Sequence, residues 1–298
     1  IFHSVSAFCN AGIDIIGSTS FQQYALSPLI NFTTMFLIVM GGLGFPVWHD
    51  IATNVRKIGK ERKRPLKWLF TRLSLQSRIV IVMTISLILF GTLCFFIIEF
   101  ENPATMKDMN VFQKIMASMF QSVTTRTAGY ATVSQAGLEE SSKLIGCILM
   151  FVGGSPAGTA GGIKTTTAAM LVLTVLCVLR NRRDTECFDR KIDIESIKSG
   201  ITIALITFLV LFTGIMALTV FEPGVDVLDL MYEAASAMGT VGLSADLTPS
   251  LTRASHIVLM LMMYIGRIGP LTMALVFAGK SDKSSQFREL PEEKVMLG

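Results

Sequence analysis

The chain is half hydrophobic and sparsely charged. It has 298 residues, of which 51% are hydrophobic and 16% are charged, and its net charge is +4 at pH 7. Because soluble domains carry about 25% charged residues, this composition and a mean hydropathy of +0.57 exclude an ordinary soluble protein. We interpret the chain as an integral membrane protein. The five cysteines show neither disulfide nor metal-ligand spacing, and we expect them to act as small apolar residues.

Five apolar runs are long enough to cross a bilayer, which takes about 20 residues of helix. These predicted spans are, in chain order, Leu29–Trp48, Ile79–Phe100, Leu144–Leu179, Ile201–Phe221 and His256–Ala278. The connections 51–78 and 180–198 are rich in Lys and Arg, whereas the others lean acidic. Because positively charged loops stay in the cytoplasm, we place these two connections inside the cell. Nucleic-acid contacts are the alternative, but they would not explain why both basic runs flank apolar spans.

A short motif with a central glycine occurs three times, as Asn-Ala-Gly, Thr-Ala-Gly and Thr-Val-Gly. Its glycines are Gly12, Gly129 and Gly242, which are 117 and 113 residues apart, so the chain contains an internal repeat. Each motif follows a short apolar segment, namely Ser4–Cys9, Val111–Val123 and Val227–Met238. These segments are too short to cross the membrane, and sidedness requires the chain to return outside after the last two. We therefore predict three re-entrant units, each a half-depth helix followed by a returning loop.

The returning loops are predicted to form an ion-selectivity filter from backbone carbonyls. Irregular backbone at membrane depth is tolerated only where it is buried in protein or lines a water-filled cavity. Glycine with small neighbours lets carbonyls approach one axis. No carboxylate lies within the motifs, which favours a large monovalent cation such as K+ over a divalent ion. The predicted filter residues are Asn10, Ala11, Gly12, Thr127, Ala128, Gly129, Thr240, Val241 and Gly242.

Three charged residues lie next to these motifs. Asp14 and Asp246 follow the first and third motifs, where they either concentrate cations or cap a loop; the sequence leaves both open. Arg126 precedes the second motif, where an exposed cation would repel the ion. We therefore expect its side chain to point back into the protein, with a salt bridge or bonds to carbonyls behind the filter.

Helix breakers interrupt the long helix after each loop. They occur at Gly41–Pro46, Gly153–Gly162 and Gly266–Pro270, and both Gly and Pro weaken a helix interior. Because Leu144–Leu179 is far longer than one span, we predict a loop inside the membrane over Gly153–Thr165, beneath the filter, with the flexibility of a gate. The predicted gating residues are Gly153, Gly154, Ser155, Pro156, Ala157, Gly158, Thr159, Ala160, Gly161, Gly162 and Lys164.

Two basic residues lie at the level of this loop. Arg267 is in mid-span, where a charge costs about 2.5–3.5 kcal/mol and normally has a partner. We expect it to brace the loop and to add an electrostatic barrier below the filter; a purely structural bond to exposed carbonyls is the alternative. Lys164 ends the loop, and we expect it to snorkel toward the cytoplasm.

The sequence shows no catalytic constellation. The stretch 158–165 nearly matches a phosphate-binding P-loop, but that motif needs a glycine directly before the lysine, where this chain has Ile163. It also needs a preceding strand, whereas here an apolar helix is predicted. The three histidines are scattered, without metal-ligand spacing. We predict that the chain is not an enzyme and has no organic cofactor.

Together these features resemble the Trk/Ktr/HKT superfamily of potassium transporters. The resemblance rests on the three single-glycine motifs, the segment GGSPAGTAGGIKTTT at Gly153–Thr167 and the mid-membrane Arg267. That segment and the ending PEEKVMLG at 291–298 are most similar to the KtrB-type membrane subunits of bacterial Ktr systems. The resemblance covers the whole chain and implies sodium-stimulated potassium uptake across a bacterial cell membrane.

The resemblance also implies an all-α membrane fold, in which four span–pore helix–span repeats surround a central pore. Gly12, Gly129 and Gly242 would be the filter glycines of repeats two, three and four, with 153–165 as the gating loop and Arg267 as its brace. Since the chain begins within a repeat, we expect repeat one and the first span of repeat two to be missing from it. The implied partners are a second copy, forming a homodimer, and a cytoplasmic ring of nucleotide-binding KtrA-type regulatory subunits. K+ is the transported ion, and Na+ is expected as an activator.

These expectations divide the chain into six segments. Residues 1–58 form the pore loop and second span of repeat two, and 59–77 form a basic cytoplasmic loop. Residues 78–180 are repeat three with its intramembrane loop 153–165, followed by a cytoplasmic loop at 181–199. Residues 200–279 are repeat four, and 280–298 are a cytoplasmic C-terminal tail.

Other functions stay open at this point. The runner-up is a Trk- or HKT-like subunit that passes sodium or couples Na+ to K+, although a glycine in every repeat favours potassium. A secondary transporter with discontinuous helices would be built from inverted repeats, whereas these repeats run in the same direction. A non-conducting scaffold or receptor would leave the filter glycines unexplained.

Overall fold

The computed structural model of the chain describes residues 1–17, 19–60, 70–182 and 184–269. This part is helical apart from loops and one small antiparallel hairpin, made of β1 (Glu186–Cys187) and β2 (Arg190–Lys191). The predicted tail 280–298, much of the basic loop 59–77 and the end of the last predicted span lie outside the described residues.

The helices form three units of similar plan, each with a short helix, a glycine motif and a longer helix. The first unit comprises α1 (Phe2–Phe8), the 3-10 helix η1 (Gln22–Tyr24), α2 (Pro28–Gly42) and α3 (Phe45–Lys60). The second comprises α5 (Leu75–Ile98), α6 (Val111–Thr124), α7 (Glu140–Phe151) and α8 (Thr165–Leu179). The third comprises α9 (Ile194–Phe221), α10 (Val227–Gly239), the 3-10 helix η2 (Thr248–Ser250) and α11 (Arg253–Ile268). The short helices α1, α6 and α10 coincide with the three short apolar segments predicted from the sequence.

The two longest helices have side-chain caps at their N-termini and are apolar along their length. The Ser74 hydroxyl accepts a bond from the first turn of α5, and the Asp193 carboxylate does so for α9. These helices have 24 and 28 residues with mean hydropathies of 2.7 and 2.6. Within the described residues they are the two helices long and apolar enough to cross a membrane. The count is three if the bent pair α2–α3 is taken as one span.

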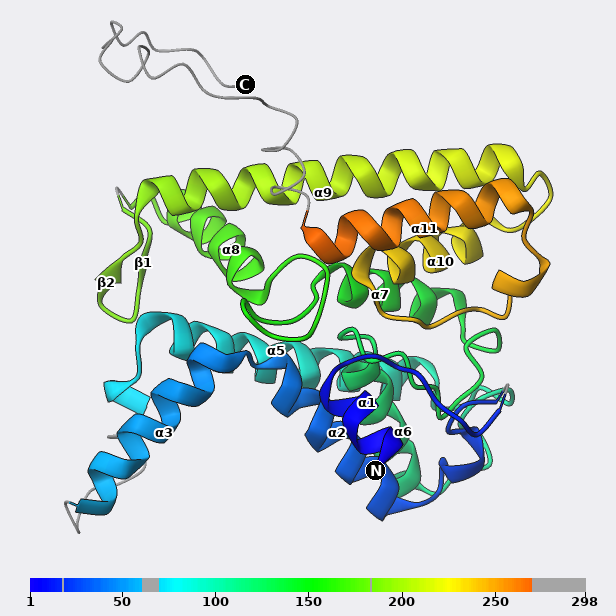
Figure 1. Cartoon of the computed structure of the whole chain (residues 1–298), viewed down its shortest axis with the longest axis horizontal. Coiled ribbons are helices and arrows are strands. Elements are labelled where there is room, and N and C mark those ends of the chain that lie inside the picture. Colours follow the sequence, from blue (N-terminus) through cyan, green and yellow to red (C-terminus); the bar gives the residue numbers. More distant parts are fainter. Residues whose placement is uncertain (18, 61–69, 183, 270–298) are drawn as a thin grey trace, which may run out of the picture.

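The predicted span Leu29–Trp48 is not one straight helix, because α2 and α3 meet at a bend of 96°. Gly44 lies between them with φ +85°, a backbone angle that glycine adopts easily. The indole N–H of Trp48 reaches back across the bend and donates a 2.9 Å hydrogen bond to the Met40 carbonyl. The break falls inside the predicted interruption Gly41–Pro46, and Figure 1 shows α3 diverging from α2.

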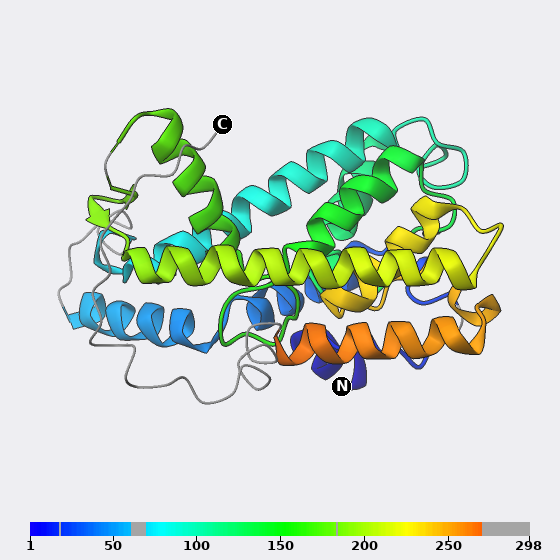
Figure 2. The same cartoon turned by 90° about the horizontal axis from the view of Figure 1, so that it is seen from above.

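The second long predicted helix is also interrupted where its glycines lie. The chain is helical in α7 and α8, but residues 152–164 form a loop, which agrees with the predicted break at 153–165. Backbone bonds close the base of this loop, from Gly153 N–H to the Ile163 carbonyl and from Thr165 N–H to the Gly154 carbonyl, both 2.9 Å long. Figures 1 and 2 show the loop in the middle of the molecule.

Apolar side chains pack where the units meet. One cluster joins α1, α2 and α6 and includes Ile38, Phe120 and Tyr130, all fully buried or nearly so. A second cluster joins α7 and α10 through Met150 and Tyr232. In contrast, the outward faces of α5 and α9 expose large apolar side chains such as Leu89, Leu93, Leu205, Phe208 and Phe212. Long helices that are apolar on their outer faces are typical of contact with lipid.

Candidate functional site

The three glycine motifs share an unusual backbone conformation. In each, the first and third residues have positive φ, which most residues avoid. The φ values are +51° and +66° at Asn10 and Gly12, +67° and +85° at Thr127 and Gly129, and +52° and +92° at Thr240 and Gly242. Asparagine tolerates this region, but a β-branched threonine rarely occupies it. Such strain persists only where the surroundings enforce it, and it clusters at functional sites.

The glycines of the three motifs lie side by side although they are far apart in sequence. A Cβ atom on Gly12 would lie 2.9 Å from the Cα of Gly129 and would overlap the carbonyl oxygen of Ala128. A Cβ atom on Gly129 would lie 3.1 Å from the Cα of Gly12 and would overlap the carbonyl oxygen of Val241. Only glycine is therefore compatible with this packing at both positions. A carbonyl of each of two loops faces the glycine of the preceding loop.

Gly242 is less enclosed than the other two glycines. A Cβ atom there would meet only the Cα of Gly129, at 3.7 Å, which is ordinary van der Waals contact. Successive loops touch through Gly12 and Ala128 and through Gly129 and Val241. Within the described residues, no equivalent contact of Gly242 joins the third loop back to the first, so the arrangement is open on that side.

A cavity of about 190 Å³ lies beside the three glycines. All three glycines line it, together with the polar residues Asp14, Thr19, Ser20, Gln22, Gln135, Ser244 and Asp246. A carboxylate oxygen of Asp14 accepts bonds from the N–H groups of Ile16, at 3.1 Å, and Gly17, at 3.4 Å. Asp14 therefore caps its loop, one of the two roles left open by the sequence, and also lines the cavity.

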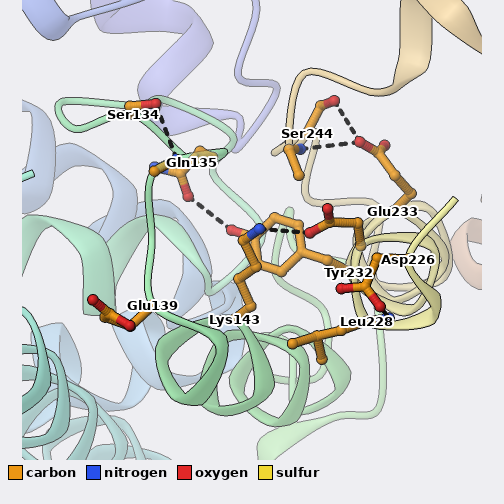
Figure 3. Close-up of polar contacts among 12 residues, drawn as sticks. Ser134, Gln135, Glu139, Lys143, Asp226, Leu228, Tyr232, Glu233 and Ser244 are labelled. Carbon is orange, nitrogen blue, oxygen red and sulfur yellow. Dashed lines mark hydrogen bonds and ion pairs between the residues drawn. The ribbon is translucent and has the colours of Figure 1, made fainter. Parts of the chain in front are cut away.

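Buried polar side chains join the second and third units behind the glycines. The Tyr232 hydroxyl on α10 donates a 2.7 Å hydrogen bond to Oε1 of Gln135, and Figure 3 shows these two side chains pointing toward one another. The amides of Gln135 and Gln121 exchange two further bonds, 2.7 and 3.1 Å long. These residues were not singled out from the sequence. The available signal was the polar side chains of Gln121 and Tyr232 on the otherwise apolar helices α6 and α10; Gln135 lies in the loop before α7 and gave none.

A tyrosine also connects the second unit to the first. The Tyr130 hydroxyl, one residue after Gly129, donates a 3.3 Å bond to the carbonyl of Ile13. Its ring stacks on Phe21 with centroids 4.5 Å apart. One tyrosine hydroxyl therefore joins the first and second loops, and another joins α10 of the third unit to the second loop.

A buried carboxylate holds the loop that follows Gly242. Glu233 lies on α10 and is 4% exposed. It accepts bonds from the hydroxyl of Ser244, shown in Figure 3, from the N–H of Ala245 at 3.0 Å and from the hydroxyl of Thr248 at 2.9 Å. A buried charge needs such partners, and these donors fix the returning chain against α10. Glu233 was not singled out from the sequence.

Arg126 points back into the protein, as expected, but its predicted partners are wrong. Its guanidinium lies 3.4 Å from the hydroxyl of Thr84 on α5, and Nε has no hydrogen-bond partner among the described residues. No salt bridge to Arg126 occurs in this part of the chain. The Arg126 carbonyl instead accepts a long 3.5 Å bond from the side-chain amide of Asn10.

The 152–164 loop packs against both the glycine motifs and the bend of the first unit. The N–H of Ser155 donates a 3.0 Å bond to the Gly42 carbonyl, and the N–H of Phe45 donates a 3.2 Å bond to the Ala157 carbonyl. A Cβ atom on Gly161 would overlap the hydroxyl of Thr240. The loop thus touches the first residue of the third motif directly.

Two basic side chains hold consecutive carbonyls of this loop. Arg267 donates a 2.6 Å bond to the carbonyl of Thr159. Lys164 donates a 2.8 Å bond to the carbonyl of Ala160. The expectation that Lys164 snorkels away from the loop is therefore wrong, because the exposed carbonyl beside it offers a nearer partner. The cysteines are all free, and no group of three or more His, Cys, Asp or Glu side chains among the described residues is placed to hold a metal ion.

Comparison with known proteins confirms the predicted superfamily. The profile of the TrkH family, described as cation transport protein, matches residues 1–287. Ktr system potassium uptake protein B of Bacillus subtilis (strain 168) is 34% identical over 298 residues, which cover 100% of this chain and 63% of that protein. Potassium/sodium uptake protein NtpJ of Enterococcus hirae is 33% identical over 303 residues, again covering 100% of this chain and 63% of that protein.

A solved structure shows the same fold. The crystal structure of the potassium transporter TrkH from Vibrio parahaemolyticus matches with a TM-score of 0.69 at 18% identity, over 92% of this chain and 57% of that chain. The chain thus spans less than two thirds of the length of these proteins. The family consists of ion transporters that cross the membrane several times, and not of enzymes. Since the profile covers nearly every residue, the chain belongs to the TrkH family of cation transport proteins.

Proposed function

We propose that this chain forms most of a potassium-uptake pathway, in which the three glycine motifs supply backbone carbonyls to a selectivity filter. The observation that carries the proposal is the contact of Gly12 and Gly129 with the carbonyls of Ala128 and Val241. Because the glycines have no side chains, the loops approach until their carbonyls crowd together. Carbonyls so arranged replace the water shell of a bare cation.

Potassium is the ion that the names of both relatives contain. One is named a potassium uptake protein and another a potassium/sodium uptake protein. The motifs contain no carboxylate, which suits a weakly hydrated monovalent cation. The second name keeps sodium permeation, or Na+/K+ symport, as the alternative function. Competition between the two ions during uptake distinguishes them.

A fourth loop would complete the filter. The three motifs contact one another in sequence, but Gly242 faces an open side within the described residues, and the chain spans 63% of its curated relatives. A span–pore helix–span repeat on that side would close the ring. We therefore assign the three motifs to repeats two, three and four of a four-repeat pore.

The 152–164 loop would act as the gate of this pathway. The contact of Gly161 with Thr240 of the third motif supports a position of this loop on the ion path just below the filter. Its glycines make it deformable, and the bonds from Arg267 and Lys164 hold it in place. Both side chains are cationic, so in this position they also oppose the passage of a cation.

Regulation would come from outside this chain. The name "Ktr system" of the 34% identical relative supports a multi-subunit assembly. We propose a homodimer with a cytoplasmic ring of nucleotide-binding KtrA-type subunits, and Na+ as an activator. Copurification of the complete protein with a KtrA-type subunit, followed by mass measurement in detergent, tests this assembly.

The central test is potassium uptake by the complete protein in a bacterium that lacks its own uptake systems. The expected result is growth at low external K+ and saturable uptake that rises when Na+ is added. Absence of rescue, with the protein present in the membrane, would contradict the proposal. Equal uptake of Na+ and K+ in competition would favour the sodium-permeable alternative.

A further inference from the structure

Thr159 is the residue at which the 152–164 loop contacts four other parts of the chain. Its carbonyl accepts the 2.6 Å bond from Arg267 on α11. Its N–H donates a 3.4 Å bond to the Gly41 carbonyl at the end of α2. Its hydroxyl donates a 2.7 Å bond to Oδ1 of Asn10, the first residue of the first glycine motif, and also lies 3.4 Å from the carbonyl of Phe8 at the end of α1. One residue of the loop is therefore bonded to α11, to α2, to the end of α1 and, most closely among its side-chain bonds, to the proposed filter.

The Asn10 side chain also contacts the residue before the second motif. While Oδ1 accepts from Thr159, the amide nitrogen faces the Arg126 carbonyl at 3.5 Å, immediately before the Thr127–Gly129 motif. Asn10 is 5% exposed and has φ +51°, so both its backbone and its amide are fixed by the surroundings. Its amide bridges the loop beneath and the second motif.

The equivalent residues of the other motifs lack such a bond. Thr127 and Thr240 occupy the same position as Asn10, and their buried hydroxyls have no hydrogen-bond partner within the described residues. Thr240 packs against Gly161. The Thr159–Asn10 bond is thus the one side-chain hydrogen bond, in the described part of the chain, between a first motif residue and the loop.

We propose that Thr159 and Asn10 couple the gate to the filter, so that displacement of the 152–164 loop alters the ion preference of the glycine motifs as well as the flux. This inference rests on the proposed function of the loop and the motifs. If the loop moves to let an ion pass, the Thr159 hydroxyl leaves Asn10, and Oδ1 loses its donor. A buried acceptor without a donor is unfavourable, so Asn10 then shifts. The bond from its amide nitrogen to the Arg126 carbonyl, next to the second motif, is then lost as well.

The role assigned to Thr159 is a positioning role, since its hydroxyl acts on the filter through Asn10. Thr159→Val keeps the shape of the side chain and removes the hydroxyl. The expected result is a rise of about threefold to tenfold in the K+ concentration for half-maximal uptake, the range that one hydrogen bond supplies. Inhibition of uptake by Na+ should strengthen in parallel. Thr159→Ser retains the hydroxyl and should restore both values.

Thr174→Val is the matched control. The Thr174 hydroxyl bonds only the Met170 carbonyl within its own helix, at 2.7 Å, so its loss should leave K+ half-saturation and Na+ inhibition unchanged. A Thr159→Val variant that alters only the maximal rate, with both ion-dependent values unchanged, would overturn the coupling. So would an equal change in the Thr174→Val protein.

A stability measurement separates failure of the coupling from failure of the proposed function. A double-mutant cycle with Thr159→Val and Asn10→Ala, read from unfolding of the purified protein in detergent, needs no transport. Non-additive effects show that the bond exists in solution, whereas additive effects overturn the inference. If the cycle shows coupling but the parent protein takes up no K+, the proposed function fails and the assignment of this bond to filter control fails with it.

Discussion

The guanidinium of Arg267 donates a 2.6 Å hydrogen bond to the backbone carbonyl of Thr159, which lies 108 residues away in sequence. Because a hydrogen bond from a charged donor is worth about 1.5–3 kcal/mol, its loss should release the 152–164 loop. We expect Arg267→Ala to raise K+ uptake roughly tenfold when no regulatory subunit is present. Uptake per molecule of membrane-inserted protein is the measurement.

Two further variants test whether this bond is responsible. Arg267→Lys keeps the charge but lacks the planar, pre-organised guanidinium, so we expect an intermediate uptake rate. Arg253→Ala removes an arginine from the first turn of the same helix and should leave the rate unchanged. A fall in uptake by well-folded Arg267→Ala protein would show that Arg267 supports conduction and does not restrain it.

Gly129 is enclosed by the two neighbouring loops, so any side chain there should disturb the proposed filter. A Cβ atom would overlap the Val241 carbonyl, and φ is +85°, which costs a residue other than glycine about 1–2 kcal/mol. We expect Gly129→Ser to raise the K+ concentration for half-maximal uptake by about tenfold, or to raise Na+ uptake relative to K+ uptake by about tenfold. Uptake measured across a range of K+ and Na+ concentrations gives both values.

Gly200 provides the matched control for this substitution. It lies within α9, where an added Cβ would meet only the Thr167 side chain at 3.7 Å. Gly200→Ser should leave ion preference unaltered, because the added side chain has room in a helix that favours it over glycine. Unchanged selectivity in the Gly129→Ser protein would argue against the filter assignment.

Tyr232 tests the connection between the second and third units. Its buried hydroxyl bonds Oε1 of Gln135 at 2.7 Å, so Tyr232→Phe should lower the free energy of unfolding by about 1–2 kcal/mol. Tyr264→Phe is the control, because Tyr264 is 60% exposed and its hydroxyl loss should be neutral. Chemical denaturation in detergent compares the two. Equal stability of both variants would mean that the Tyr232 bond does not hold the units together.

Local features of the fold were predictable because their signals are local. The short helices, the motif glycines and the break after Phe151 all depend on composition and spacing within about a dozen residues. The convergence of Gly12 and Gly129 followed from sidedness together with the internal repeat. For these features, a pattern in the local sequence directly predicts the backbone geometry.

The polar partners were not predictable, because they depend on how the folded chain brings donors and acceptors together. Lys164 was expected to extend toward the cytoplasm, yet it bonds Ala160 within its own loop. Arg126 was expected to have a salt bridge, yet it lies beside Thr84. Tyr232 and Gln135 are 97 residues apart, and nothing in either local sequence indicates the other. The 96° bend at Gly44 likewise depends on contacts of the 152–164 loop as well as on glycine.

A pH-dependent contact in the third unit joins the end of α9 to the start of α11. Glu222 follows α9, and its carboxylate accepts bonds from the Ser255 hydroxyl, at 2.6 Å, and the Thr252 N–H, at 2.7 Å. These bonds stabilise the ionised form and lower the pKa of Glu222 from its usual 4.5, with the Ser255 hydroxyl as the main cause. Since the pKa is lower in the folded protein, the stabilisation is complete above pH 4.5 and is lost as the pH falls through the lowered value.

Glu222→Gln should therefore matter at neutral pH and not in acid. The variant keeps the shape of the side chain but loses the charge that favours the N-terminus of α11. We expect faster hydrogen exchange in the first turns of α11 at pH 7, and the difference from the parent protein should shrink below pH 4.5. Glu101→Gln, an exposed carboxylate in the loop after α5, is the control and should leave α11 unchanged at both pH values. If the difference at Glu222 instead persists undiminished in acid, the amide's altered geometry, and not the lost charge, is its cause.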